Sequence, residues 1–202
     1  SYLGAAIFVI LGGVPFSALV VLFVNFVIQV PIAIALGFDK PSPGLMERKP
    51  RPLTQPVLSR SQWIRLIFTG FLIALGTLTI EATFEPISTP VAATMGFVVF
   101  SLFNVVMGLS ARSETNTVFD IENLSDRRQL GLYGLALVMT ILGTELGLFQ
   151  RILGTVELSG RQWLLCIVFA VALLLIDEVV KFFMRRRRQS KPDVTVQELQ
   201  LA

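Results

Sequence analysis

Two side-chain amides lie inside a strongly apolar stretch near the N-terminus of this 202-residue chain. Asn25 and Gln29 are four residues apart, a spacing that places them on one face of an α-helix. Pro31 follows them, and because proline has no backbone N–H, the carbonyl of Val27 would lose its helical hydrogen-bond partner. The two amides and this carbonyl could therefore offer oxygen ligands to a cation around one point.

Polar groups of this kind have two explanations inside a membrane. Carbonyls without a partner persist at membrane depth only within protein or beside a water-filled cavity, and partly unwound helices form ion sites in transporters. Alternatively, the two amides only hydrogen-bond neighbouring helices and hold the bundle together. The residues by themselves leave both explanations open.

The composition predicts a membrane setting for this stretch. The chain is 53% hydrophobic and 15% charged, and its mean hydropathy is +0.72. Its apolar residues fall in blocks of roughly 20, the length of helix that crosses a bilayer core of about 30 Å. The blocks lack both the polar stripe of a soluble helix and the alternation of a membrane barrel. We therefore expect an all-α membrane protein, a polytopic bundle of transmembrane helices.

Five full spans and a truncated first helix are expected. The apolar segment 3–11 is too short to cross a bilayer, and a Gly-Gly-Val-Pro sequence ends it, so we expect the chain to be the rear part of a longer protein. The transmembrane domain should cover 1–184, and a basic, polar tail should cover 185–202. The five full spans are expected at residues 16–38, 63–84, 91–109, 130–149 and 163–180.

The distribution of Lys and Arg predicts the orientation. Basic residues concentrate in the connections 39–62 and 110–129 and in the tail, whereas 85–90 has none and 150–160 has only Arg151. Because basic loops stay on the cytoplasmic side, we expect these three segments and the C-terminus in the cytoplasm. The tail is interpreted as an anchor at anionic headgroups and not as a nucleic-acid site. The expected location is a bacterial plasma membrane.

Charged residues near the span ends are expected to be structural. Glu81 and Glu145 lie in the outer thirds of their spans and Arg65 near a cytoplasmic end, so all three are predicted to snorkel to water. Asp177 and Glu178 are predicted to pair locally with Lys181, four and three residues later in the same helix, at the membrane edge. Histidine is absent and the chain has one cysteine, which excludes an internal disulfide and disfavours zinc chemistry.

Several segments resemble the C-terminal membrane region of P-type cation-transporting ATPases of the calcium-pump-like branch. LFVNFVIQVPIAIALGFDKPSPGLMERKPRP, which begins at Leu22, is similar to that family's sixth transmembrane helix and the following loop. LSARSETNTVF (109–119) resembles the segment after the eighth helix. FQRILGTVELSGRQWLL (149–165) and IDEVVKFF (176–183) resemble the turn before the tenth helix and the end of that helix. The likeness covers nearly the whole chain in order, so the spans would be family helices five to ten.

The resemblance implies that catalysis belongs to another part of such a pump. In the family, an aspartate in a DKTG motif accepts the phosphoryl group of MgATP, and this motif does not occur here. ATP and Mg would therefore be cofactors of the N-terminal remainder, with its actuator, phosphorylation and nucleotide domains and first helices. That remainder and the lipid bilayer are the expected partners. This chain alone should neither bind nor hydrolyse ATP and should contain no catalytic residue.

The resemblance also places a cation path at the sixth helix, with two departures. Gln29 stands where the family has a principal aspartate ligand, so the oxygen remains without the charge that divalent cations favour. Ser42 and Gly44 stand where the family's loop is acidic. Asn104 occupies a position at which the family has Glu, Gln or Asn. The candidate cation-path ligands are Asn25, Val27, Gln29 and Asn104.

Three functions are compatible with these observations. The first is the membrane-embedded C-terminal part of an ATP-driven P-type cation pump. The second is a free-standing membrane scaffold or regulatory remnant derived from such a pump. The third is an unrelated transporter or channel, although no internal inverted repeat of the kind found in many carriers is evident. A DKTG motif upstream of Ser1 would distinguish the first function from the second.

Overall fold

The computed structural model describes residues 10, 16–38, 60–111 and 127–189, and within these ranges the only regular elements are helices. The all-α prediction is therefore confirmed. In chain order the elements are α2 (Ala18–Phe23), η1 (Val24–Gln29), α3 (Val30–Gly37), α4 (Arg60–Phe84), α5 (Thr89–Ala111), α7 (Arg127–Glu145), α8 (Gly147–Leu153) and α9 (Gly160–Gln189). The helices α2, η1 and α3 follow one another directly and form one continuous rod.

Most of the expected spans coincide with these helices. Within the described ranges four stretches are long and apolar enough to cross a membrane: Ala18–Gly37, Gln62–Phe84, Thr89–Ser110 and Gly160–Val180. A fifth candidate is α7 together with α8, which are bent by 81° relative to each other. The fourth predicted span thus turns after Glu145 instead of continuing straight to Phe149. The expected truncated helix at 3–11 lies outside the described residues, apart from residue 10.

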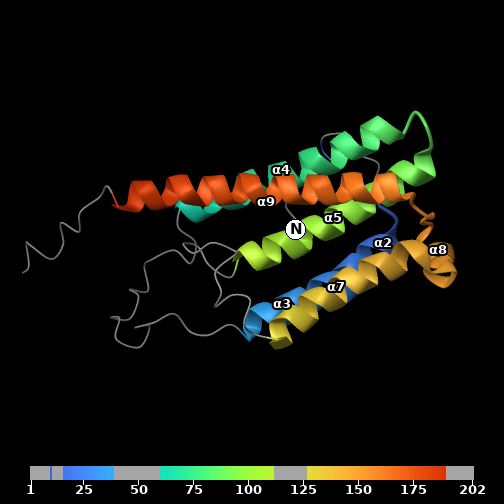
Figure 1. Ribbon diagram of the computed structural model, residues 1–202, viewed down its shortest axis with the longest axis horizontal. Coiled ribbons are helices and arrows are strands. Elements are labelled where there is room, and N and C mark those ends of the chain that lie inside the picture. The colour runs from blue at the N-terminus through green and yellow to red at the C-terminus, as the bar shows by residue number, and fades with distance from the viewer. Residues whose placement is uncertain (1–9, 11–15, 39–59, 112–126, 190–202) are drawn as a thin grey trace, which may run out of the picture.

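The helix α5 is the centre of the bundle (Figure 1). It packs against α4 and α9 on one side and against η1, α3 and α7 on the other. In an apolar stretch of 18 residues within its span 72% of the residues are buried, compared with 28% for α4 and 22% for α9. The outer faces of α4 and α9 expose many Leu, Ile, Val and Phe side chains. Such faces suit lipid, whereas α5 carries four buried polar residues, Thr94, Ser101, Asn104 and Ser110.

Two glycines allow other helices to approach α5 closely. A Cβ at Gly108 would collide with the Ile32 side chain of α3, and one at Gly96 would lie 2.6 Å from Glu81 Oε1 of α4. Small residues at helix contacts are the usual means of close packing in membranes, where no hydrophobic force drives helices together. The contacts of α5 with its neighbours on both sides therefore depend on glycine.

The break between α7 and α8 is held by side chains. The chain turns at Leu146, where the helical hydrogen-bond ladder of α7 ends. Thr155 Oγ1 donates to the Gly143 carbonyl at 2.6 Å, and Gln150 Nε2 donates to the Thr144 carbonyl at 2.7 Å. Carbonyls that would otherwise lack a partner near the membrane are thus satisfied.

A capping box starts α9. The Ser159 N–H donates to Gln162 Oε1 at 2.7 Å, and the Gln162 N–H donates to Ser159 Oγ at 3.4 Å. The preceding connection begins at Gly154, whose positive φ of 73° ends α8 in the left-handed conformation. The Trp163 indole N–H donates to Glu145 Oε1 at 2.9 Å, and Glu145 is exposed, as expected for a carboxylate near the membrane edge.

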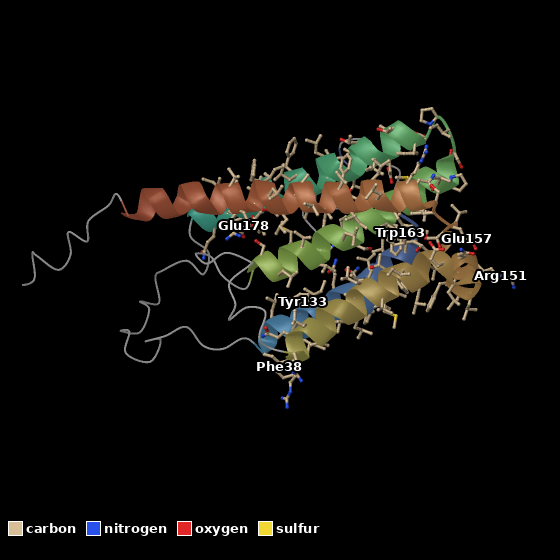
Figure 2. All side chains as sticks on the ribbon, viewed as in Figure 1. Phe38, Tyr133, Arg151, Glu157, Trp163 and Glu178 are labelled. Atoms are coloured by element: carbon tan, nitrogen blue, oxygen red, sulfur yellow. The ribbon has the colours of Figure 1, made fainter. Side chains whose placement is uncertain are left out.

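The two ends of the bundle carry different groups of elements. Arg151, Glu157 and Trp163 lie at one end, and Phe38 lies towards the other (Figure 2). The last residues of α3 and α5 and the first residues of α4 and α7 are found towards the Phe38 end (Figure 1). The helices that flank the two basic connections therefore meet at one end of the bundle, called the basic end below. This arrangement agrees with the predicted alternation of the spans.

Candidate functional site

The stretch with the two amides forms a π-helix, η1, within the continuous α2–η1–α3 rod. A partly unwound helix at Pro31, which belonged to the first of the two explanations for this stretch, is not observed. Pro31 is buried in the first turn of α3, and the helix continues through it to Gly37. In a π-turn each carbonyl pairs five residues ahead instead of four, and the rod passes from this wider turn into α3 without a break. Whether the carbonyl of Val27 is available to a cation stays a prediction.

Asn25 and Gln29 are both half-buried on η1. Neither side chain makes a hydrogen bond to any residue in the described part of the chain. η1 packs against α5 and α7, so polar partners on those helices would be within reach of its inner face. The two amides therefore do not join the described helices to one another by hydrogen bonds.

One stripe of α5 faces the rod that contains η1. Phe97 packs against Phe23 of α2 in an edge-to-face contact with ring centroids 6.0 Å apart, and Gly108 packs against Ile32 of α3. Residues spaced by three or four share a helix face, so the residues between Phe97 and Gly108 on this face also point towards the rod. The stripe consists of Phe97, Ser101, Asn104 and Gly108.

Asn104 lies level with the end of η1. The Phe97–Phe23 and Gly108–Ile32 contacts bracket the stripe, and α5 and the rod run in the same direction, so Asn104 is beside the part of η1 that carries Gln29. Asn104 is buried, and its amide N–H donates to the Phe100 carbonyl of its own helix at 2.7 Å. This bond uses the amide nitrogen, so the oxygen that a cation would need is not consumed by it.

Ser101 is a further polar group on the same stripe that the sequence interpretation missed. Its side chain is fully buried, and its Oγ has no hydrogen-bond partner in the described part of the chain. Other buried hydroxyls donate to the carbonyl four residues earlier, as Thr77 does to Ile73 at 2.9 Å. A single serine in an apolar helix is typical of close packing, and only its spacing of three from Asn104 indicated a shared face.

The carboxylate Glu81 does not reach water as predicted. It is only 5% exposed and lies between α4 and α5, where the missing side chain of Gly96 makes room for its carboxyl group. The burial of Glu81 is not predictable from the sequence of α4, because the space that it occupies depends on a residue of another helix. Glu145, for which the same prediction was made, is exposed.

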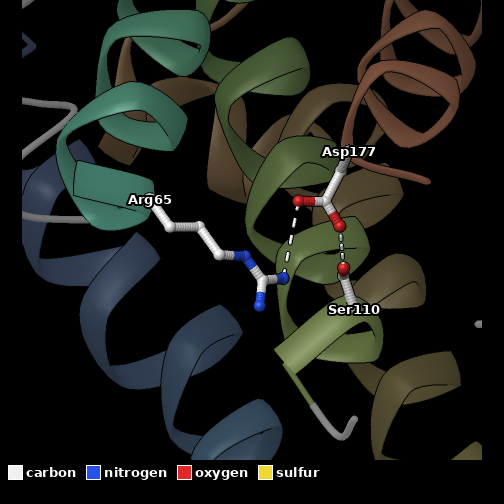
Figure 3. Close-up of polar contacts among 3 residues, drawn as sticks. All are labelled: Arg65, Ser110 and Asp177. Atoms are coloured by element: carbon white, nitrogen blue, oxygen red, sulfur yellow. Dashed lines mark hydrogen bonds and ion pairs between the residues drawn. The ribbon is translucent and has the colours of Figure 1, made fainter. Parts of the chain in front are cut away.

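Arg65 also differs from its prediction. Its guanidinium is directed to Asp177 of α9, with an N–O distance of 3.5 Å, instead of to water alone (Figure 3). The second carboxylate oxygen of Asp177 accepts a hydrogen bond from the hydroxyl of Ser110 on α5. Asp177 therefore contacts two other helices, and the side chain of its predicted partner Lys181 lies outside the described residues.

The polar residues on the stripe of α5 and on η1 can offer only neutral oxygens to a cation. In the described ranges no group of three or more Cys, Asp and Glu residues is placed to hold a metal ion. Amide, hydroxyl and carbonyl oxygens bind hard cations, but without carboxylates they do so weakly. The ligand role of Asn25, Val27, Gln29 and Asn104 stays a prediction.

Comparison with known proteins gives a consistent result. The family model described as "Cation transporting ATPase, C-terminus" matches residues 13–183. "Calcium-transporting ATPase 1" of Schizosaccharomyces pombe is 27% identical over 86% of this chain, and "Calcium-transporting ATPase type 2C member 2" of Mus musculus is 28% identical over 88%. "Calcium-transporting ATPase type 2C member 1" of Homo sapiens is 25% identical over 90%.

The chain spans only part of these relatives. It covers 20%, 19% and 20% of the lengths of the fission yeast, mouse and human proteins. The family match extends over most of the chain and includes every described helix that is apolar enough to cross a membrane. The chain therefore belongs to the cation-transporting ATPase C-terminus family, as a multi-pass membrane region.

Proposed function

We propose that this chain works as the membrane-embedded C-terminal part of an ATP-driven P-type cation pump and that its rod and α5 line the cation path. Family membership supports the first statement. The observation that carries the second is η1, a π-helix whose two half-buried amides have no hydrogen bond in the described part of the chain, and of which Gln29 lies level with Asn104. The proposed oxygen ligands are Asn25, Val27, Gln29 and Asn104, to which we add Ser101.

A cation path explains features that are otherwise costly. An amide or hydroxyl in an apolar setting without a hydrogen bond costs on the order of 1–3 kcal/mol. π-helical segments occur frequently at functional sites, where the wider turn changes the direction of backbone and side chain. A transported cation would satisfy these oxygens for part of the pump cycle, which gives a reason for their presence.

The proposed cation is one that tolerates neutral ligands. The relatives reported above are named calcium-transporting ATPases. Gln29 supplies an oxygen without a charge, so this site suits a weakly held or singly charged ion better than a tightly held divalent one. Any further charge would come from the N-terminal remainder of the pump, which we also propose as the place where ATP and Mg bind.

The proposed orientation follows from charge. The basic end of the bundle faces the cytoplasm in this proposal, and the C-terminus is on the same side. The relatives reported above come from eukaryotes, and a bacterial plasma membrane stays an expectation from the sequence. The lipid bilayer and the remainder of the pump are the proposed partners.

The decisive experiment changes Gln29 in the full-length pump. We expect Gln29→Leu to abolish cation-stimulated ATP hydrolysis, because leucine removes the oxygen. Gln29→Asp should raise the apparent affinity for divalent cations at least about tenfold, which corresponds to about 1.4 kcal/mol. The measurement is the ATPase rate as a function of cation concentration over a panel of cations.

Thr79→Val is the control for this experiment. Thr79 is exposed on α4, and its hydroxyl donates to the Leu75 carbonyl of its own helix at 2.8 Å, so its loss should leave the cation dependence unchanged. If Gln29→Leu behaves like Thr79→Val, Gln29 is a structural amide and the proposed path is in the wrong place.

A further inference from the structure

A polar cluster outside the proposed cation path consists of Arg65, Ser110 and Asp177. Each residue comes from a different helix: Arg65 from α4, Ser110 from α5 and Asp177 from α9 (Figure 3). We propose that these residues form a three-helix clamp that locks α4, α5 and α9 into one unit at the basic end of the bundle. In this proposal Asp177 is a structural carboxylate and not a cation ligand.

The burial of the Asp177 carboxylate requires a partner for it. It is buried, 4% exposed, inside the stretch Gly160–Val180 that can cross a membrane. An uncompensated carboxylate at such a place is strongly unfavourable. Arg65 balances the charge through one carboxylate oxygen, and Ser110 donates a hydrogen bond to the other, so both oxygens are occupied. An acidic residue inside a membrane span often has a role in transport. Here, however, a guanidinium and a hydroxyl from neighbouring helices already satisfy the carboxylate.

The position of the clamp gives it a role that apolar packing does not fill. α4 and α9 each pack extensively on α5 and much less on each other. Apolar helix faces in lipid define the axial position of a helix only weakly, since lipid is as apolar as the helices. A single buried polar contact, in contrast, can fix the register of neighbouring helices. The Arg65–Asp177 pair is the described contact that joins α4 to α9 by charge.

The clamp and the proposed cation path lie on different sides of α5. Ser110 follows Asn104 by six residues and Ser101 by nine. At 3.6 residues per turn these spacings rotate it about 120° from Asn104 and about 180° from Ser101. The polar stripe faces η1, and Ser110 faces the α4–α9 side. This separation, which matters only if the proposed cation path is correct, predicts that the two functions can be perturbed independently.

Thermal unfolding of the full-length protein in detergent tests the clamp. Arg65→Met removes the guanidinium that balances the charge of the buried Asp177 carboxylate and should lower the Tm by at least about 5 °C. Asp177→Leu should lower it less, because the freed Arg65 side chain is 20% exposed and can reach water. The double variant Arg65→Met, Asp177→Leu should recover at least half of the loss caused by Arg65→Met. Asp177→Asn offers a milder variant of similar shape if the leucine variant does not fold.

Arg151→Met is the matched control, because Arg151 is an exposed arginine of α8. It should leave the Tm unchanged. Single losses that simply add in the double variant, or an Arg65→Met variant that is as stable as Arg151→Met, would overturn the clamp. This outcome does not depend on whether the protein pumps cations.

A second measurement tests the structural assignment of Asp177. In the double variant the apparent cation affinity of ATP hydrolysis should stay within about twofold of the parent value, as for a change away from the site. A double variant with the parent Tm but without cation dependence would place Asp177 in the cation path and refute this assignment. Loss of cation dependence in Gln29→Leu at the same time would leave the proposed function itself intact.

Discussion

Polar side chains in this bundle find their partners in two different ways. Thr77 and Thr140 donate to carbonyls of their own helices, which satisfies the hydroxyl without any neighbour. Asp177 depends instead on two other helices. Asn104 is only partly satisfied within its own helix, because its amide nitrogen donates to the Phe100 carbonyl of α5 and that bond does not use its oxygen. A residue that is satisfied within its own helix can be replaced by an apolar one at little cost in stability. Replacing a residue that bonds to another helix, or whose oxygen is available to a ligand, changes that contact or that binding.

Ser101 provides a residue-level prediction in which stability and function separate. Its hydroxyl is buried without a partner in the described part of the chain, so Ser101→Ala removes an unsatisfied group and should leave the Tm unchanged or raise it. If Ser101 contributes to the cation path, the same change lowers the apparent cation affinity of ATP hydrolysis. Both quantities are measured on the full-length pump, beside Thr77→Val as a control for loss of a satisfied hydroxyl. A drop in Tm without a change in cation affinity would show that Ser101 is a packing residue only.

The helices themselves owe their arrangement to a few local irregularities. η1 widens the rod where it passes α5, and the turn at Leu146 redirects the chain across the end of the bundle. Gly108 lets α3 approach α5, and Gly96 makes room for Glu81 between α4 and α5. Each of these irregular positions lies at a contact of α5 or at the end of the bundle. They therefore determine how closely the regular helices approach α5 and where the chain changes direction.

Gly108→Ala tests the packing of α5 against α3. A Cβ at this position would collide with Ile32 and would lie 3.1 Å from the Tyr133 ring, so the helices must separate to admit it. We expect a loss of about 1–3 kcal/mol in unfolding free energy, the usual cost of overpacking. Gly131→Ala is the control, since a Cβ there meets nothing within 4 Å. The measurement is thermal or denaturant unfolding, and equal stability of the two variants would contradict the close α3–α5 contact.

The sequence predicts this architecture well where it depends on local composition. Three expected spans lie within helices of the structure, and the span expected at 16–38 exceeds the helical rod Ala18–Gly37 by two residues at one end and one at the other. Long apolar blocks with polar ends define such helices almost by themselves. The π-helix, the buried Glu81 and the Arg65–Asp177 pair were not predicted. Glu81 and Asp177 take their environment from helices that are distant in sequence, and the backbone pairing of η1 depends on the neighbours that support it. Of the candidate site, the amides of η1 and Asn104 could be predicted, whereas Ser101 needed the stripe of α5 to be known.

At the scale of the whole molecule, α5 separates two groups of helices. α4 and α9 lie on one side with the clamp, and the rod and α7 lie on the other (Figure 1). The candidate oxygens are found where the second group meets α5. A small shift of the rod along α5 would therefore change the separation of Gln29 and Asn104 and leave the clamp undisturbed.

Cysteine labelling tests the proposed position of the whole bundle in the membrane. In a Cys166→Ala background, where the buried native cysteine is removed, Glu85→Cys and Glu157→Cys should react with a membrane-impermeant reagent from outside. Arg127→Cys, at the start of α7, should react only after the membrane is permeabilised, because basic segments stay in the cytoplasm. Labelling of Glu85→Cys and Arg127→Cys from the same side would refute the proposed topology.

The π-helical segment also affects how this chain tolerates changes in length. A turn closed by pairing five residues ahead holds one residue more than an α-helical turn, so η1 contains a surplus residue. Deleting one residue from a regular span rotates everything beyond it by about 100° and turns apolar faces away from lipid. A deletion within Val24–Gln29 would instead remove the surplus and leave α3 facing α5 and α7 as before. Among the described spans, the stretch proposed to contact the cation is thus the one in which evolution could have gained or lost a residue without rebuilding the bundle.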